Sequence, residues 1–401
     1  MNFSRRGFLK ALGIGAGAAI GTRIPGARLI GEANAAVTEP TSVVVLHLQG
    51  GYNALFASAD SLVGRFGVTG NGKDNGNWRA LANGNGPGID LAWFNSMSPF
   101  TRQHMAAVGV RHGISNHPGA RRALWDHQNR NAGLLLANAI GGTSQLKAAV
   151  VGPRLLDSSY TPIGQTSFQS ITDMQKTIDA LGGGKPDPRV PDRTIAAAGV
   201  EAAQTMSGNA LTGSPESLDS LESGYVAAID TLKAPVKKFS FDELKTAYAL
   251  GDATAVNNLK SKFAAAELMV RAGSNVVQIV DAGWDTHGDT DGATVRNKMR
   301  TVLPPLNAFI KRMVEDKTRN VTVVIMGDFA RSLPGSDHQP NLTATVIGKN
   351  VKVGTTGRTA KGAVTLAPGT PGIAGLWSYL ATLAKVDDNP FGANPHSKLV
   401  A

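Results

Sequence analysis

Three runs of mostly β-branched apolar residues constrain most strongly how this chain can fold. They cover residues 41–48, 275–280 and 320–326, and glycine and polar residues follow each of them. A strand that is buried on both faces has this composition, because neither side of its pleat meets water. We therefore expect the three runs to be parallel strands in the interior of one sheet.

Segments with helical spacing alternate with these strands. Such an order predicts an α/β fold, with a mostly parallel central sheet and helices on both faces. A mainly helical insertion is expected at about 192–273, within a single domain over residues 36–401. The other elements that we predict are helices at 120–140, 260–270, 290–317 and 375–384, and short strands at 105–110 and 148–151.

Residues 1–35 have the pattern of a bacterial twin-arginine signal peptide. Residues 4–10 contain paired arginines, a weakly apolar Gly/Ala-rich run covers 11–20, and the Ala-Asn-Ala sequence at 33–35 offers a cleavage site. A secretory signal combines these three features, and paired arginines indicate the route for folded cargo. We expect the twin-arginine translocase to deliver the mature chain to the periplasm or the cell exterior.

Composition narrows the possible partners. The chain has no cysteine, so it cannot form disulfides in an oxidising compartment. Its formal net charge is +10, which favours anionic ligands, but no Lys/Arg stripe is interleaved with aromatic residues as in nucleic-acid binders. The apolar run at 11–20 is too short for a permanent membrane helix, and we expect no stable membrane span.

Polar residues follow each of the three central strands, at 50–53, 283–288 and 327–332. Open α/β sheets bind ligands beyond the carboxyl ends of their strands. The clusters are therefore expected at one edge of the sheet, where their side chains can act on a common ligand.

Four of these polar residues suggest a metal site. In Asp285-Thr286-His287 a carboxylate and an imidazole can reach one ion, Asp328 follows a rigid strand, and His338 could complete the set. Two carboxylates with two imidazoles suit zinc, manganese or iron. A divalent ion of this kind would acidify a water or polarise a phosphoryl or sulfuryl oxygen.

Each of these residues also has a simpler interpretation. Asp285 could cap a turn, Asp328 could begin a helix, and the histidines could lie on the surface. Arg331 could bind a phosphate or sulfate bidentately, or it could form a structural ion pair with Asp328 or Asp337. His396, near the C-terminus, is expected to be solvated.

The motifs resemble those of a bacterial family known as domain of unknown function 1501. Residues 283–287 reproduce the Gly-Trp-Asp-Thr-His motif of that family, and residues 49–54, 116–118, 328–332 and 335–339 are looser matches to its other motifs, in the same order. The resemblance implies a fold shared with alkaline phosphatases, sulfatases and cofactor-independent phosphoglycerate mutases.

The resemblance also implies roles for individual residues. Asn53 matches a position where the fold has an acid; it can ligate through its carbonyl oxygen but brings no charge. His117 matches the position of a family histidine and could be a ligand or an acid, and Ser58 is the nearest hydroxyl after Asn53 and a candidate nucleophile. The positions that match metal ligands are Asp285, His287, Asp328 and His338.

We therefore expect an exported, metal-dependent hydrolase of a phosphate or sulfate ester, acting on an envelope or extracellular polymer. Its cofactor would be a divalent ion, and Arg331 would assist the substrate anion. The alternative is a non-catalytic envelope protein that keeps the fold and binds a partner or polymer. Asn53 and the lack of an evident nucleophile favour this alternative.

Overall fold

The structure, a computed structural model, describes residues 39–51, 57–58, 78–81, 87–142, 144, 146–152, 161–164, 166–183, 193–210, 239–289, 293–330, 338–357 and 369–401. The predicted signal peptide, Asn53 and Arg331 lie outside these ranges, as does the side chain of Ser58. The described residues between 175 and 240 form one compact unit, and the others form a second.

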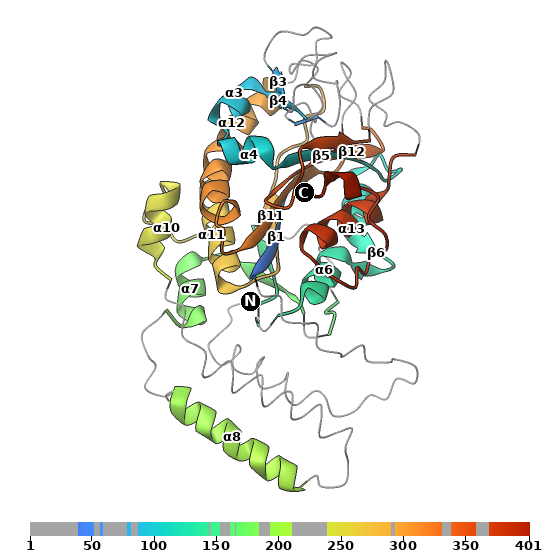
Figure 1. Ribbon diagram of the computed structural model, residues 1–401. Helices are drawn as coiled ribbons and strands as arrows, with labels where there is room; N and C mark the ends of the chain where they lie inside the picture. Colours follow the sequence, from blue (N-terminus) through green and yellow to red (C-terminus); the bar gives the residue numbers. More distant parts are fainter. Residues whose placement is uncertain are drawn as a thin grey trace. The chain divides into compact units, whose positions relative to one another are not determined.

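An eight-stranded sheet forms the centre of the second unit, in the order β13-β5-β12-β11-β1-β10-β8-β9 (Figure 1). Of these strands, β12 alone runs against the others. The predicted mixed α/β fold with a mostly parallel sheet is thus confirmed. The strands are β1 (Thr41–Leu48), β5 (Met105–Arg111), β8 (Ala148–Val151), β9 (Phe168–Ile171), β10 (Val276–Asp281), β11 (Asn320–Gly327), β12 (Asn341–Gly348) and β13 (Gly354–Thr356).

β1 lies between β10 and β11, and all of its residues are buried. Side chains alternate along a strand, so Val43 and Val45 face the core on one side of the sheet while Val44 and Leu46 face the other. Full burial of one such side chain contributes about 1.5–3 kcal/mol. These alternating apolar contacts hold β1, and the residues at its end, in a fixed position.

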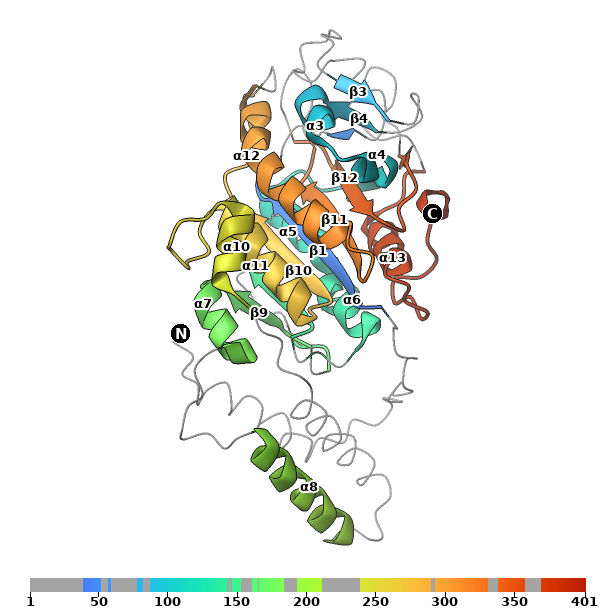
Figure 2. The ribbon, with the colours of Figure 1, turned by 60° about the vertical axis from the view of Figure 1, so that its left-hand side comes forward.

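Helices cover both faces of the sheet (Figures 1 and 2). On one face, α11 (Leu259–Ala272) contacts β8 and β10, and η4 (Ile310–Val314), the π-helical continuation of α12 (Ala293–Phe309), contacts β11. On the other face, α6 (Ala132–Ile140) contacts β8 and β10, and α13 (Ile373–Leu383) contacts β5.

A buried carboxylate joins three of these helical segments. Glu267 of α11 is fully buried and accepts hydrogen bonds from Tyr248, at 2.8 Å, and from the guanidinium of Arg312, at 2.7 and 2.8 Å. Glu243 accepts a further bond of 2.7 Å from Arg312. Because Tyr248 ends α10 (Phe241–Tyr248) and Arg312 lies in η4, this network ties both elements to α11.

Shorter elements complete the described structure. In the unit formed by residues 175–240, the described elements are most of α7 (Met174–Ile178), η3 (Asp179–Gly183) and α8 (Arg193–Ala210). The residues of the predicted insertion at about 192–273 therefore belong partly to one unit and partly to the other. The sheet unit also contains α3 (Leu91–Ser96), α4 (Pro99–Gln103), α5 (His117–Trp125), η5 (Ser397–Leu399), the small sheet of β2 (Ala57–Ser58), β4 (Gly88–Asp90) and β3 (Trp78–Ala80), and the hairpin of β6 (Asp126–His127) and β7 (Arg130–Asn131).

Two local predictions were wrong. The helix expected at 120–140 is interrupted by the hairpin of β6 and β7, because Gln128 and Asn129 adopt positive φ angles of 51° and 63° in its turn. His396, expected in solvent, is 1 % exposed and lies 3.0 Å from the Thr356 hydroxyl. In the part of the chain that the structure describes, no helix combines the length and apolar character needed to cross a membrane.

Candidate metal centre

The carboxyl ends of β1, β10 and β11 lie side by side, because Leu48 pairs with both Asp281 and Gly327. The chain leaves β1 through Gly50, whose φ is 134°, and a Cβ atom there would lie 2.2 Å from the backbone nitrogen of Asp285. Only glycine allows this approach. The loops that follow the three strands are therefore packed against each other at one edge of the sheet.

Asp328, the first residue after β11, is fully buried and surrounded by donors. Its Oδ1 atom is 2.8 Å from His47 Nε2, and its Oδ2 atom is 2.8 Å from His117 Nδ1 and 3.3 Å from Arg121 Nε. Burial favours the neutral acid, but the hydrogen bonds from His47 and His117 and the charge of Arg121 outweigh it, so the pKa of Asp328 is lowered. Asp328 is therefore an ionised carboxylate, which can accept hydrogen bonds but cannot donate them.

His117 begins α5, where Asn116 caps the helix by accepting a 2.9 Å hydrogen bond from Gly119 N. Because Asp328 can only accept, Nδ1 of His117 carries a proton, and in the neutral imidazole Nε2 carries the free lone pair. That Nε2 atom is buried, has no hydrogen-bond partner among the described residues, and lies 3.3 Å from Asp285 Oδ2. This is the arrangement of a metal-binding histidine held by a carboxylate.

His338 is oriented in the same way by a backbone group. Its Nδ1 atom lies 2.7 Å from the carbonyl oxygen of Ser115, which can only accept, so Nε2 again carries the lone pair. The ring centroid of His338 is 4.8 Å from that of His117 and 4.3 Å from that of Phe329. Two neighbouring imidazoles thus each have Nδ1 bonded to an acceptor, which in the neutral rings leaves Nε2 as the metal-binding atom.

The ligand atoms of His117, Asp285 and His338 all lie within 4.8 Å of one another. Ligand atoms about 2.0–2.1 Å from a tetrahedral ion are roughly 3.4 Å apart, and His117 Nε2 and Asp285 Oδ2, at 3.3 Å, already have this spacing. The side chain of Asp285 is 54 % exposed, so it can adjust without disturbing the core. Two histidines, one carboxylate and an open side match catalytic zinc sites.

The predicted site residues occupy different places around this centre. Asp285, His117 and His338 form the cluster, whereas Asp328 lies behind His117 with both oxygens engaged by protein donors. His287 is exposed, and its ring centroid is 5.8 Å from that of His338.

Sequence reasoning missed two contributors, His47 and Arg121. His47 had a detectable signal, because a histidine inside an otherwise apolar strand requires a buried polar partner. Arg121 had none in sequence; it reaches Asp328 because it lies one helical turn after His117 on α5.

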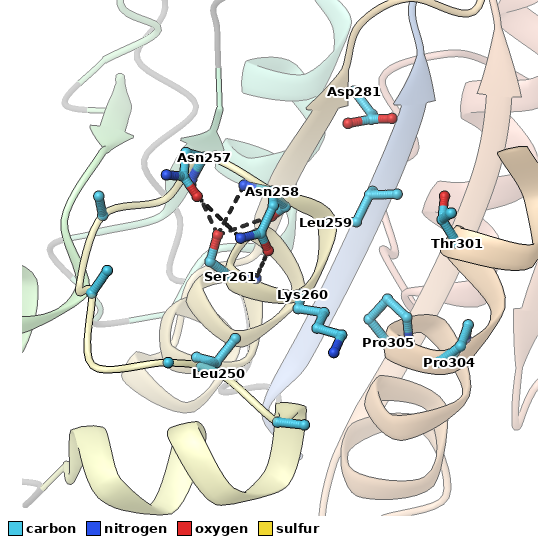
Figure 3. A pocket seen from close by; sticks show the side chains of 14 residues that line it. Leu250, Asn257, Asn258, Leu259, Lys260, Ser261, Asp281, Thr301, Pro304 and Pro305 are labelled. Carbon is cyan, nitrogen blue, oxygen red and sulfur yellow. Dashed lines mark hydrogen bonds between the residues drawn. The ribbon is translucent and has the colours of Figure 1, made fainter.

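A groove of about 750 Å³ opens between α12, the N-terminus of α11 and the loop before it (Figure 3). Leu250, Leu259 and Pro304 are among its apolar lining residues. Asp281, at the end of β10, also lines the groove, and its second oxygen accepts a 2.7 Å hydrogen bond from the indole of Trp284. Asp281 therefore lines the groove and, through its hydrogen bond to Trp284, also holds the loop that carries Asp285.

Comparison with known proteins agrees with the motif resemblance. Residues 238–368 match the family described as "Protein of unknown function (DUF1501)". No curated protein matches the chain. The matched segment contains Asp285, His287, Asp328 and His338, and over this segment the chain is similar to the DUF1501 family.

Proposed function

We propose that the protein is an exported, metal-dependent hydrolase of a phosphate or sulfate ester. The observation that carries the proposal is that ligand atoms of His117, Asp285 and His338 lie within 4.8 Å of one another, while the Nδ1 atom of each imidazole is within hydrogen-bond distance of an acceptor. This hydrogen bond fixes both the tautomer and the ring plane. In the neutral form of each ring, the Nε2 atom is then left available to a metal ion.

The donor set fits a divalent ion of the zinc, manganese or iron type. Imidazole nitrogens with one carboxylate suit these metals better than calcium or magnesium, which prefer oxygen. When bound, such an ion supplies Lewis-acid chemistry, because it polarises a phosphoryl or sulfuryl oxygen and lowers the pKa of water. The side chains of His117, Asp285 and His338 would hold it.

Arg121 is the described residue best placed to orient an anionic group. Its Nε atom is fixed by Asp328, at 3.3 Å, and by the carbonyl oxygen of His117, at 3.2 Å, and its side chain is 21 % exposed. The two terminal nitrogens of a guanidinium held in this way can donate to a phosphate or sulfate. The proposal therefore gives Arg121 the anion-binding role, alongside Arg331.

Metal analysis and turnover test the proposal together. The purified mature protein should contain one divalent ion per chain and hydrolyse an aryl phosphate or aryl sulfate. Asp285→Ala and His338→Ala should lose both properties, whereas Asp387→Ala, which changes an exposed carboxylate outside the cluster, should keep them. A wild-type protein without stoichiometric metal would refute the proposal. Bound metal without turnover on any ester would instead support the non-catalytic alternative.

Export is a separate part of the proposal. It rests on the paired arginines and the Gly/Ala-rich run within residues 1–35. Replacing Arg5 and Arg6 with lysine should leave the unprocessed precursor in the cytoplasm, as judged by cell fractionation. Unchanged delivery of the double variant to the periplasm would show that another route is used.

A further inference from the structure

We propose that His47 is a positioning residue for the candidate metal centre, acting through Asp328 on the ring of His117. This inference rests on the proposed metal site, but it concerns a residue that neither the motifs nor the family match singles out. It predicts that metal affinity depends on a side chain that does not touch the metal ligands.

The first observation is the place of His47 in the sheet. It is fully buried in β1, one residue before the strand ends, and its backbone pairs with Val280 of β10 and Met326 of β11. A side chain on a strand held from both sides has little freedom to move. His47 is thus a rigid donor directly below the edge where the metal cluster lies.

The second observation is how the two oxygens of Asp328 are divided. Oδ1 accepts from His47 Nε2 at 2.8 Å, and Oδ2 accepts from His117 Nδ1 at the same distance. A carboxylate anchored through one oxygen cannot rotate, so the other oxygen keeps a fixed direction. Without His47, Oδ1 would be buried without its donor, and the carboxylate would be held through Oδ2 alone, by His117 and Arg121, so its hydrogen bond to Nδ1 of His117 would be less tightly fixed.

The third observation separates this role from simple satisfaction of a core histidine. His47 Nδ1 is buried and has no hydrogen-bond partner in the described part of the chain, and the nearby Trp125 indole nitrogen and both polar atoms of Gln278 are also unpartnered there. Among the described residues, Asp328 is the hydrogen-bond partner of the His47 ring. Here only the nitrogen that faces Asp328 is used.

A matched pair of amides tests the inference in the mature protein. In His47→Gln the amide nitrogen lies near the position of Nε2 and can still donate to Asp328, whereas in His47→Asn it lies near Nδ1 and falls short. Zinc affinity, measured by competition with a chromophoric chelator, should fall about 10- to 100-fold in His47→Asn and His47→Leu but remain near wild type in His47→Gln. Gln278→Leu, which changes a buried polar side chain on a neighbouring strand, should leave zinc affinity unchanged.

Nitrogen-15 chemical shifts of His117 provide a readout that does not need the metal. The metal-free wild type and His47→Gln should show the tautomer protonated at Nδ1, and His47→Asn should show a mixture. Equal zinc affinity and equal His117 shifts in the Asn and Gln variants would overturn the inference, even if His47→Leu fails to fold. If the wild type binds no zinc, the proposed function fails, and the His117 shifts alone decide the positioning role.

Discussion

Replacing Asp328 by asparagine tests whether the buried carboxylate sets the proton positions at the candidate metal centre. Asparagine keeps one acceptor oxygen but presents an NH₂ group in place of the second. Arg121 can only donate, so the amide oxygen must face Arg121 and His117, and the NH₂ group must face His47. His47 can then accept at Nε2 if its proton moves to Nδ1, where the buried N–H has no acceptor among the described residues. We therefore expect Asp328→Asn to fold.

The loss of folding stability in Asp328→Asn can be estimated from the hydrogen bonds that change. A hydrogen bond to a charged group contributes about 1.5–3 kcal/mol and a neutral one about 0.5–1.5 kcal/mol, so each of the two 2.8 Å bonds to Asp328 loses about 1 kcal/mol. The neutral amide is easier to bury, which offsets part of this loss. The unpaired N–H at His47 Nδ1 adds a cost of about 1–3 kcal/mol, so the expected destabilisation is about 2–4 kcal/mol. Zinc affinity should fall about tenfold, because His117 becomes a weaker base but keeps its orientation.

Urea unfolding and zinc competition measure these two quantities, and a second substitution sharpens the test. Without Arg121 the amide of Asp328→Asn is free to turn its NH₂ group toward His117, whose proton would then move to Nε2, the nitrogen needed for the metal. The double variant with Arg121→Met should therefore lose at least a further tenfold in zinc affinity beyond the sum of the single changes. Unchanged zinc affinity in Asp328→Asn, or simple additivity in the double variant, would refute this reasoning.

Three further predictions concern other parts of the chain. Burial lowers the pKa of His396 from 6.5 to about 4, so between these pH values the unfolded chain binds more protons than the folded one. On acidification from pH 6.5 to 5 the wild type should therefore lose about 1.6 kcal/mol of stability relative to His396→Asn, as measured by urea unfolding. Glu267→Ala should destabilise the protein by about 3 kcal/mol, because it leaves Arg312 of η4 without its buried partner. Glu243→Ala, at an exposed site, should change stability by less than about 1 kcal/mol. Similar values for the two variants would contradict the network. Gly50→Ala should displace Asp285 by steric overlap and abolish zinc binding, and a variant that binds zinc normally would show that the two loops are not packed as described.

The centre of the fold could be predicted from sequence because its strands are buried on both faces. The predicted strands at 41–48, 275–280 and 320–326 agree with β1, β10 and β11 to within one residue at each end. Continuous Val and Ile runs leave no other arrangement for these segments. β12 was not predicted, although it is as buried as β11, because a sequence pattern does not reveal which segment will pair antiparallel at a sheet interior.

The candidate site could be predicted only as a set of residues. Asp285 and Asp328 both follow central strands, and nothing in their spacing distinguishes a residue that faces the cluster from one that lies behind it. The distinction comes from His117, which α5 places between Asp328 and Asp285, at 2.8 and 3.3 Å. A side chain from a different part of the chain thus decides which carboxylate faces the opening.

The different positions of the two carboxylates, Asp285 in the cluster and Asp328 behind His117, have an electrostatic consequence. With neutral His117 and His338 and one carboxylate from Asp285, the cluster carries a charge of about −1, so a divalent ion would leave the centre with a net positive charge. If Asp328 also faced the ion, its negative charge would cancel the remaining positive charge of the centre. Instead, the charge of Asp328 is offset by Arg121, at 3.3 Å. A net positive centre attracts an anionic ester and stabilises the charge that develops on its oxygens during hydrolysis. Under the proposed function, the buried position of Asp328, behind the histidine rather than in the cluster, would therefore favour an anionic ester as substrate.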